Sequence, residues 1–99
     1  MGYTHYWKKI NDVTEEHVDV INRIINLYEA ESGKKIVNGL REKGTQPEVS
    51  TELIAFNGEG EEGCETLYIE PGKKSFDCCK TKHLKYDKVV SAVLLYLEQ

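Results

Sequence analysis

Hydrophobic positions between residues 15 and 31 recur every three or four residues, which predicts an amphipathic helix over that range. Thr14 precedes it as a candidate N-cap, acidic residues fill its first turn, and Gly33 supplies a C-terminal stop. A second helical pattern covers about residues 86–98. The apolar stripe of the first helix comprises Val18, Ile21, Ile24, Ile25 and Tyr28, widened by Val20 and Leu27, and that of the second comprises Val89, Val90, Val93, Leu94 and Leu97.

Four other segments have the alternation or the aromatic and β-branched content of strands. Asn57-Gly58 and Pro71-Gly72 are interpreted as turns that end two of them. Residues 58–63 are expected to form a flexible, acidic, glycine-rich hairpin loop. The predicted strands are residues 2–9, 51–56, 65–70 and 75–81.

Residues 34–50 show no clear period and contain Gly39, Gly44 and Pro47, so most of this stretch is expected to be loop. Its apolar residues are expected to place a short turn or strand against the core. These residues are Ile36, Val37 and Leu40.

The 99 residues fit one domain over 1–99, in the order strand-helix-strand-strand-strand-helix. Short turns between the last three strands imply antiparallel pairing. The simplest arrangement lays both helices on one face of a mainly antiparallel sheet, an α+β two-layer sandwich.

The formal net charge of −4 argues against direct nucleic-acid binding, because proteins that neutralise phosphates are usually basic. No apolar run is long enough to cross a bilayer, since Ser91 interrupts the longest one, and the N-terminus lacks the apolar core of a signal peptide. We therefore expect a cytoplasmic protein that has no membrane partner.

Three cysteines, two of them adjacent, do not suggest a disulfide framework, so reduced thiols are expected. Together with a histidine they have ligand chemistry suited to zinc, although paired Cys-x-x-Cys knuckles are absent from the sequence. The alternative, which we favour, is that Cys78 is a small core residue, that the other candidates have no role in metal binding, and that the protein has no cofactor. The weak zinc candidates are Cys64, Cys78, Cys79 and His83.

Nucleophilic catalysis would need Cys79 or Cys64 next to His5 or His83, and the sequence contains no nucleophile signature around either cysteine. We therefore favour the interpretation that these thiols are inert. It follows that we favour a protein that is not an enzyme. No catalytic residue is predicted.

Two kinds of surface could bind a partner protein. Aromatic residues concentrate on the predicted strands, namely Tyr3, Tyr6, Trp7 and Tyr68, and a sheet with helices on one face leaves its other face open. Acidic residues could dock on a basic protein groove, although a solvated helix face and an exposed loop explain them as well. The predicted partner-binding residues are Glu15, Glu16, Asp19, Glu61, Glu62 and Trp7.

Several short motifs carry a resemblance. They are Gly2-Tyr3-Thr4-His5-Tyr6-Trp7, Phe56-Asn57-Gly58, Glu65-Thr66, Cys79-Lys80-Thr81 and Tyr86-Asp87. With them the chain resembles a family of short phage and prophage proteins of uncharacterised activity. Members often have a histidine where this chain has Cys64, and an Ala-Arg-Lys-Pro stretch where it has residues 82–85.

The resemblance implies a protein that binds host machinery, including CRISPR–Cas nucleases. The first hypothesis is therefore an anti-CRISPR-like inhibitor that binds a host protein complex, such as a CRISPR–Cas effector, in the host cytoplasm. A third hypothesis is a structural protein that forms a homodimer through its aromatic face.

The second hypothesis is a small-ligand-binding or enzymatic domain, because many side chains in these motifs form hydrogen bonds. Its polar pocket on the sheet would comprise His5, Asn57, Glu65, Lys80, Thr81 and Asp87.

Overall fold

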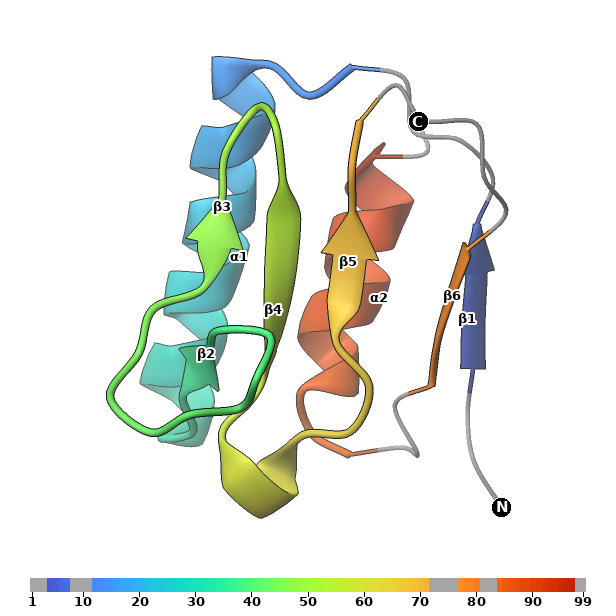
Figure 1. Ribbon diagram of the computed structural model, residues 1–99. Helices are drawn as coiled ribbons and strands as arrows, with labels where there is room; N and C mark the ends of the chain where they lie inside the picture. Colours follow the sequence, from blue (N-terminus) through green and yellow to red (C-terminus); the bar gives the residue numbers. More distant parts are fainter. Residues whose placement is uncertain (1–3, 8–11, 72–76, 81–83, 98–99) are drawn as a thin grey trace.

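The computed structural model describes residues 4–7, 12–71, 77–80 and 84–97, with only the backbone of 4–7 and 77–80 (Figure 1). Two helices pack together behind a mostly antiparallel sheet, so the α+β prediction is confirmed. In chain order the elements are β1 Thr4–Trp7, α1 Glu15–Ser32, β2 Ile36–Val37, β3 Glu48–Val49, β4 Ile54–Gly58, the 3-10 turn η1 Gly60–Glu62, β5 Leu67–Ile69, β6 Asp77–Lys80 and α2 Asp87–Leu97.

The strand β4 lies at the centre of a four-stranded sheet. The strands β2 and β3 follow each other along one edge of β4, and β5 pairs with the other edge, all antiparallel. The antiparallel pairing of β4 with β5 was predicted. The sequence also predicted that β5 pairs with the strand after it, but among the described residues β6 pairs with β1. Figure 1 shows the β1–β6 pair beyond β5.

The helix α1 begins and ends where its sequence signals predicted. Thr14 is the N-cap, and its hydroxyl accepts a hydrogen bond from the His17 backbone N–H at 3.3 Å. His17 returns the interaction, because its Nδ1 accepts the Thr14 N–H at 3.0 Å, which completes a capping box. Gly33 ends the helix with φ 72°, a left-handed conformation that suits glycine, and its N–H donates to the Glu29 carbonyl.

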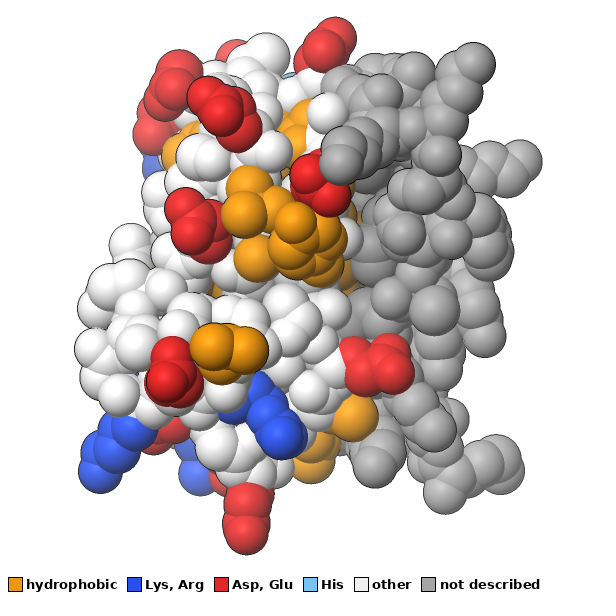
Figure 2. Space-filling model, in the orientation of Figure 1, with side chains coloured by type: hydrophobic (Ala, Val, Ile, Leu, Met, Phe, Trp, Pro, Cys, Tyr) orange, Lys and Arg blue, Asp and Glu red, His pale blue; other side chains and the backbone are white. Residues whose placement is uncertain are grey.

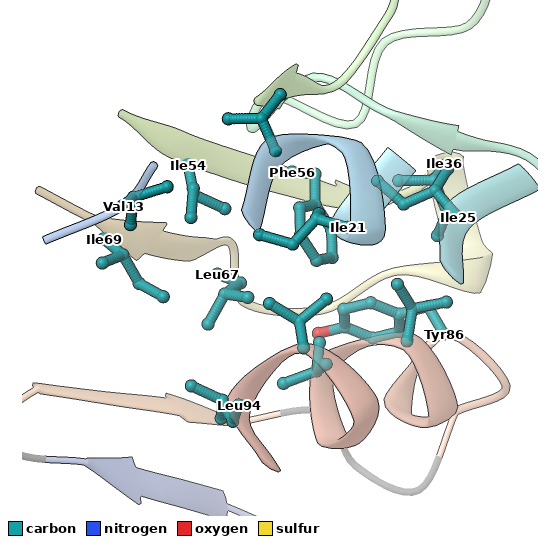
Figure 3. Close-up of a cluster of buried hydrophobic side chains, with 14 residues drawn as sticks. Val13, Ile21, Ile25, Ile36, Ile54, Phe56, Leu67, Ile69, Tyr86 and Leu94 are labelled. Atoms are coloured by element: carbon teal, nitrogen blue, oxygen red, sulfur yellow. The ribbon is translucent and has the colours of Figure 1, made fainter. Parts of the chain in front are cut away.

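The hydrophobic core lies between the two helices and the sheet (Figure 3). Tyr86 is fully buried there, and its hydroxyl donates a hydrogen bond to the Glu65 carbonyl at 2.8 Å. That bond satisfies the polar end of a large core side chain. The core cluster also contains Ile21 and Ile25 of α1, Ile36 of β2, Ile54 and Phe56 of β4, Leu67 and Ile69 of β5, and Val89, Val90, Val93 and Leu94 of α2.

Residues 34–50 are more ordered than predicted, and one prediction about them was wrong. Ile36 and Val37 are buried in β2, but Leu40 is 77% exposed. The reason is that the Asn38 side chain holds the chain beyond it, by accepting hydrogen bonds from the N–H groups of Leu40 and Glu42. This fold-back turns the Leu40 side chain toward solvent.

The interpretation of Asn57-Gly58 as a turn was also wrong. Both residues belong to β4, where they pair with Val37 and Ile36 of β2. The strand starts later than predicted, at Ile54, because residues 50–53 form a turn in which the Ser50 N–H donates to the Leu53 carbonyl. The glycine-rich segment after it contains the 3-10 turn η1, in which the Glu62 N–H donates to the Glu59 carbonyl and the Gly63 N–H donates to the Gly60 carbonyl.

Candidate functional site

The strands β3, β4 and β5 place three residues in one row across the sheet face that the helices leave open. Glu48 is opposite Ala55, and Ala55 is opposite Tyr68. Directly opposed residues share a face and lie close enough for their side chains to interact. Ala55 is nearly buried at 8% exposure, whereas Tyr68 is 49% exposed and Glu48 lies in solvent.

This open sheet face combines a hydrophobic centre with an acidic surround. Figure 2 shows hydrophobic side chains gathered over β4 and β5, with Asp and Glu side chains around them and the Lys and Arg side chains toward the lower end. Leu53, the last residue of the turn before β4, is half-buried. Glu70 follows Tyr68 on the same side, and Glu52 is exposed in the adjacent turn. An aromatic ring bordered by carboxylates suits a partner surface that is apolar and basic.

The lower part of the same face is covered by the segment 38–45. The Thr66 hydroxyl donates to the Gly39 carbonyl, and the Arg41 guanidinium donates to the Gly63 carbonyl at 3.3 Å. The Gly60 N–H donates to the Arg41 carbonyl, which ties the segment to η1. Beyond that segment, Glu48 and Tyr68 remain exposed at the two ends of the row, with the buried Ala55 between them.

The acidic residues predicted to bind a partner do not form one patch. Glu15, Glu16 and Asp19 are exposed at the start of α1, whereas Glu61 and Glu62 lie in η1 at the opposite end of the molecule (Figure 1). The 18-residue α1 separates the two groups by roughly 27 Å.

Some of these acidic residues also have local structural roles. Glu15 and Glu16 lie where negative charge offsets the helix dipole. Glu62 pairs with Lys34 at 3.2 Å, on the surface. The backbone of Trp7 is placed in β1, and its side chain is outside the described part of the molecule.

Asn57, predicted to face a ligand, instead has a structural role. Its side-chain amide donates to the Cys64 carbonyl at 2.9 Å and to the Thr66 hydroxyl at 3.3 Å. Its carbonyl oxygen accepts the N–H groups of Gly58 at 2.8 Å and Cys64 at 3.1 Å. The residue is 1% exposed, and the two donors and two acceptor positions of the amide are all used.

The structure describes the side chains of two other residues of the predicted pocket, Glu65 and Asp87. Glu65 is exposed, and Asp87 begins α2, where its carboxylate accepts a hydrogen bond from Ser91. The register of β1 and β6 places His5 opposite Cys79 and Lys80 opposite Thr4, but the structure describes only their backbones. Thr81 lies outside the described residues.

The structure describes only part of the set of four weak zinc candidates. Cys64 is a free, half-buried thiol that packs against the core. Within the described ranges, no three His, Cys, Asp or Glu side chains are grouped so that they could hold a metal ion. Cys78 and Cys79 are placed in β6 by their backbones only, and His83 is outside the described residues.

A concave feature that no sequence pattern indicated lies between the end of α1 and the start of α2. This helix groove has a volume of about 430 Å³. Its wall contains the exposed Leu27 and the buried Val89, and two lysines lie along its α2 side. The groove is lined by Ile24, Leu27, Tyr28, Glu31, Ser32, Lys85, Lys88 and Val89.

Burial raises the pKa of the Tyr28 hydroxyl in this groove above its ordinary value of 10.0, and nearby Glu62 adds to the rise, although the hydrogen bond with Ser32 opposes it. Well below pH 10.0 the hydroxyl is neutral in both the folded and the unfolded chain. As the pH rises above 10.0, the unfolded chain loses this proton first, so folding becomes less favourable.

We predict that Tyr28→Phe makes the loss of stability above pH 10.0 shallower than in the wild type. Urea unfolding at a series of pH values on both sides of 10.0 would measure this. If the free energy of unfolding falls equally steeply above pH 10.0 in the wild type and in Tyr28→Phe, the Tyr28 hydroxyl does not contribute to the fall.

Comparisons of this chain with protein-family models, curated proteins and solved structures gave no match.

Among the described residues, neither helix is long and apolar enough to cross a membrane. Tyr68 lies on the side of β5 opposite the buried Leu67 and Ile69, and its acidic neighbours come from separate turns and strands.

Proposed function

We propose that this chain is a phage-type interaction protein that binds a basic surface on a host defence nuclease, such as a CRISPR–Cas effector, and inhibits it by occupying that surface. The observation that carries the proposal is the half-exposed Tyr68 in a cross-strand row with Glu48, on a sheet face that the helices leave open. The family resemblance of the sequence supports the choice of target.

The physical chemistry of the open sheet face supports protein binding in two ways. Tyrosine is enriched among the residues that dominate binding energies, because its ring offers a large contact area while its hydroxyl tolerates water. The surrounding carboxylates would speed encounter with a basic partner and would disfavour acidic ones. The net charge of −4 acts in the same direction.

The test is a DNA-cleavage assay with a panel of purified CRISPR–Cas effector nucleases, combined with calorimetry for each nuclease that is inhibited. We expect the double variant Glu48→Ala/Tyr68→Ala to bind at least about tenfold more weakly and to inhibit correspondingly less. The affinity of the wild type should fall as salt is added, and the affinity of the double variant should fall less steeply.

Two control variants separate this surface from others. Leu95→Ala removes an exposed hydrophobic side chain from α2, which is 70% exposed, and should leave inhibition unchanged. Glu15→Ala/Glu16→Ala/Asp19→Ala tests the acidic start of α1 that the sequence pointed to. If the folded Glu48→Ala/Tyr68→Ala variant inhibits fully and the triple variant does not inhibit, the interface lies at the start of α1 and not on the open sheet face.

Other outcomes would reject the proposal itself. If none of the panel is inhibited, the nuclease target is wrong. If light scattering shows a dimer that Tyr68→Ala dissociates, a second copy of the chain occupies the open sheet face, as the homodimer hypothesis expects.

A further inference from the structure

The helix groove has features that neither the core nor the proposed interface requires. Leu27 completes the apolar stripe of α1 in the sequence, yet it is 61% exposed at the groove wall. Ile24 and Tyr28 are half-buried beside it, and Val89 contributes a buried apolar surface from α2. A contiguous apolar lining in a concave site is typical of ligand pockets, and a volume of about 430 Å³ lies in the small-molecule range.

The polar groups of the groove are unevenly distributed. Lys85 and Lys88 are both exposed and lie on the α2 side, one at the turn before the helix and one in its first turn. The Lys88 N–H donates to the Lys85 carbonyl at 3.2 Å, which fixes the spacing of the two residues along the backbone. Glu31 lies on the α1 side, so an anion would be favoured near α2 and disfavoured near the end of α1.

We propose that the helix groove binds a small anionic amphiphile, with an alkyl chain along Ile24, Leu27 and Val89 and an anionic head group beside Lys85 and Lys88. Burial of the alkyl chain removes apolar surface from water on both molecules. The two ammonium groups favour a negative head group in a chain that is acidic as a whole. The Tyr28 hydroxyl adds a hydrogen-bonding group at the groove.

The probe is decanoate below its micelle concentration, compared with decanol as a neutral amphiphile and acetate as a head group without a chain. Binding to the full chain would be followed by calorimetry and by backbone amide chemical shifts. We expect decanoate to bind roughly tenfold more tightly than decanol, and acetate to show no saturable binding. The largest shifts should fall on Ile24, Leu27 and Val89.

Two double variants with the same charge change provide the matched comparison. Lys85→Gln/Lys88→Gln should reduce decanoate affinity to that of decanol and leave decanol binding unchanged. Lys35→Gln/Lys43→Gln removes two exposed lysines that line a different depression, and it should leave decanoate binding unchanged. Leu27→Asn should weaken decanoate and decanol alike.

Three results would overturn this inference. They are equal affinities of the wild type for decanoate and decanol, equal losses in the two lysine variants, and chemical shifts centred on the open sheet face around Tyr68. All four substituted side chains are exposed lysines, so circular dichroism should show a native helix content in both double variants.

Discussion

Asn57→Ala is expected to lower the free energy of unfolding by roughly 3–4 kcal/mol, because it leaves several buried polar groups without partners. The substitution removes the acceptor of the Gly58 and Cys64 N–H groups and the donor to the Cys64 carbonyl and the Thr66 hydroxyl. Water cannot readily replace these contacts at a side chain that is 1% exposed. Urea denaturation followed by circular dichroism would measure the loss.

Two comparison variants show whether hydrogen bonding or packing causes the effect. Asn57→Leu restores side-chain volume without polar atoms, so it should be at least as destabilising as Asn57→Ala. Asn26→Ala makes the same chemical change at an exposed position of α1, where alanine favours helix and should raise stability by about 0.5 kcal/mol. A loss below about 1 kcal/mol in Asn57→Ala would mean that the four hydrogen bonds contribute little.

The same contacts explain why the Asn57-Gly58 turn signal failed. Its turn preference is local, because asparagine and glycine tolerate the backbone angles of tight turns. In the folded chain these residues pair with Val37 and Ile36, about 20 positions earlier in the sequence. Two-residue strands such as β2 and β3 are too short to show a period, so no pattern in residues 34–50 could predict their pairing.

The helices could be predicted because their signals are local and repeated. Five turns of periodic apolar residues, the Thr14 cap and the Gly33 stop all agree for α1. A detail that the sequence signals did not predict is the role of His17, which occupies the place usually taken by Glu or Gln in a capping box. Leu27 was predicted to widen the buried stripe, but its side chain is exposed and lines the helix groove. The buried face of α1 is therefore narrower than the apolar stripe in its sequence.

The candidate surfaces were only partly predictable from the sequence. Strand alternation placed Tyr68 away from the core, and the exposure of that side chain agrees. The two acidic groups named from the sequence do not form one surface, because α1 separates the group of Glu15 from the group of Glu62. Which of Glu48, Glu52 and Glu70 would accompany Tyr68 depends on strand register, which a single sequence does not specify.

The glycine at the end of β4 is expected to be required for space, not for backbone conformation. A Cβ atom on Gly58 would overlap the Glu62 carbonyl oxygen and would lie 2.7 Å from its carbonyl carbon and 3.0 Å from Gly63 Cα. These are backbone atoms, which cannot turn aside as a flexible side chain can. Gly63 is constrained in the same way, because a Cβ there would overlap Asn57 Oδ1 and the Gly58 carbonyl oxygen.

We therefore expect Gly58→Ala to lower the free energy of unfolding by about 3 kcal/mol, at the upper end of overpacking effects. Gly60→Ala, two residues further on in η1, is the matched control. Its Cβ would meet nothing within 4 Å, but its φ of 54° is left-handed, so the expected loss is about 1 kcal/mol. Urea denaturation of both variants decides between the two explanations. Equal losses would mean that the close approach of Gly58 to Glu62 can relax cheaply, and that η1 does not need to pack against the end of β4.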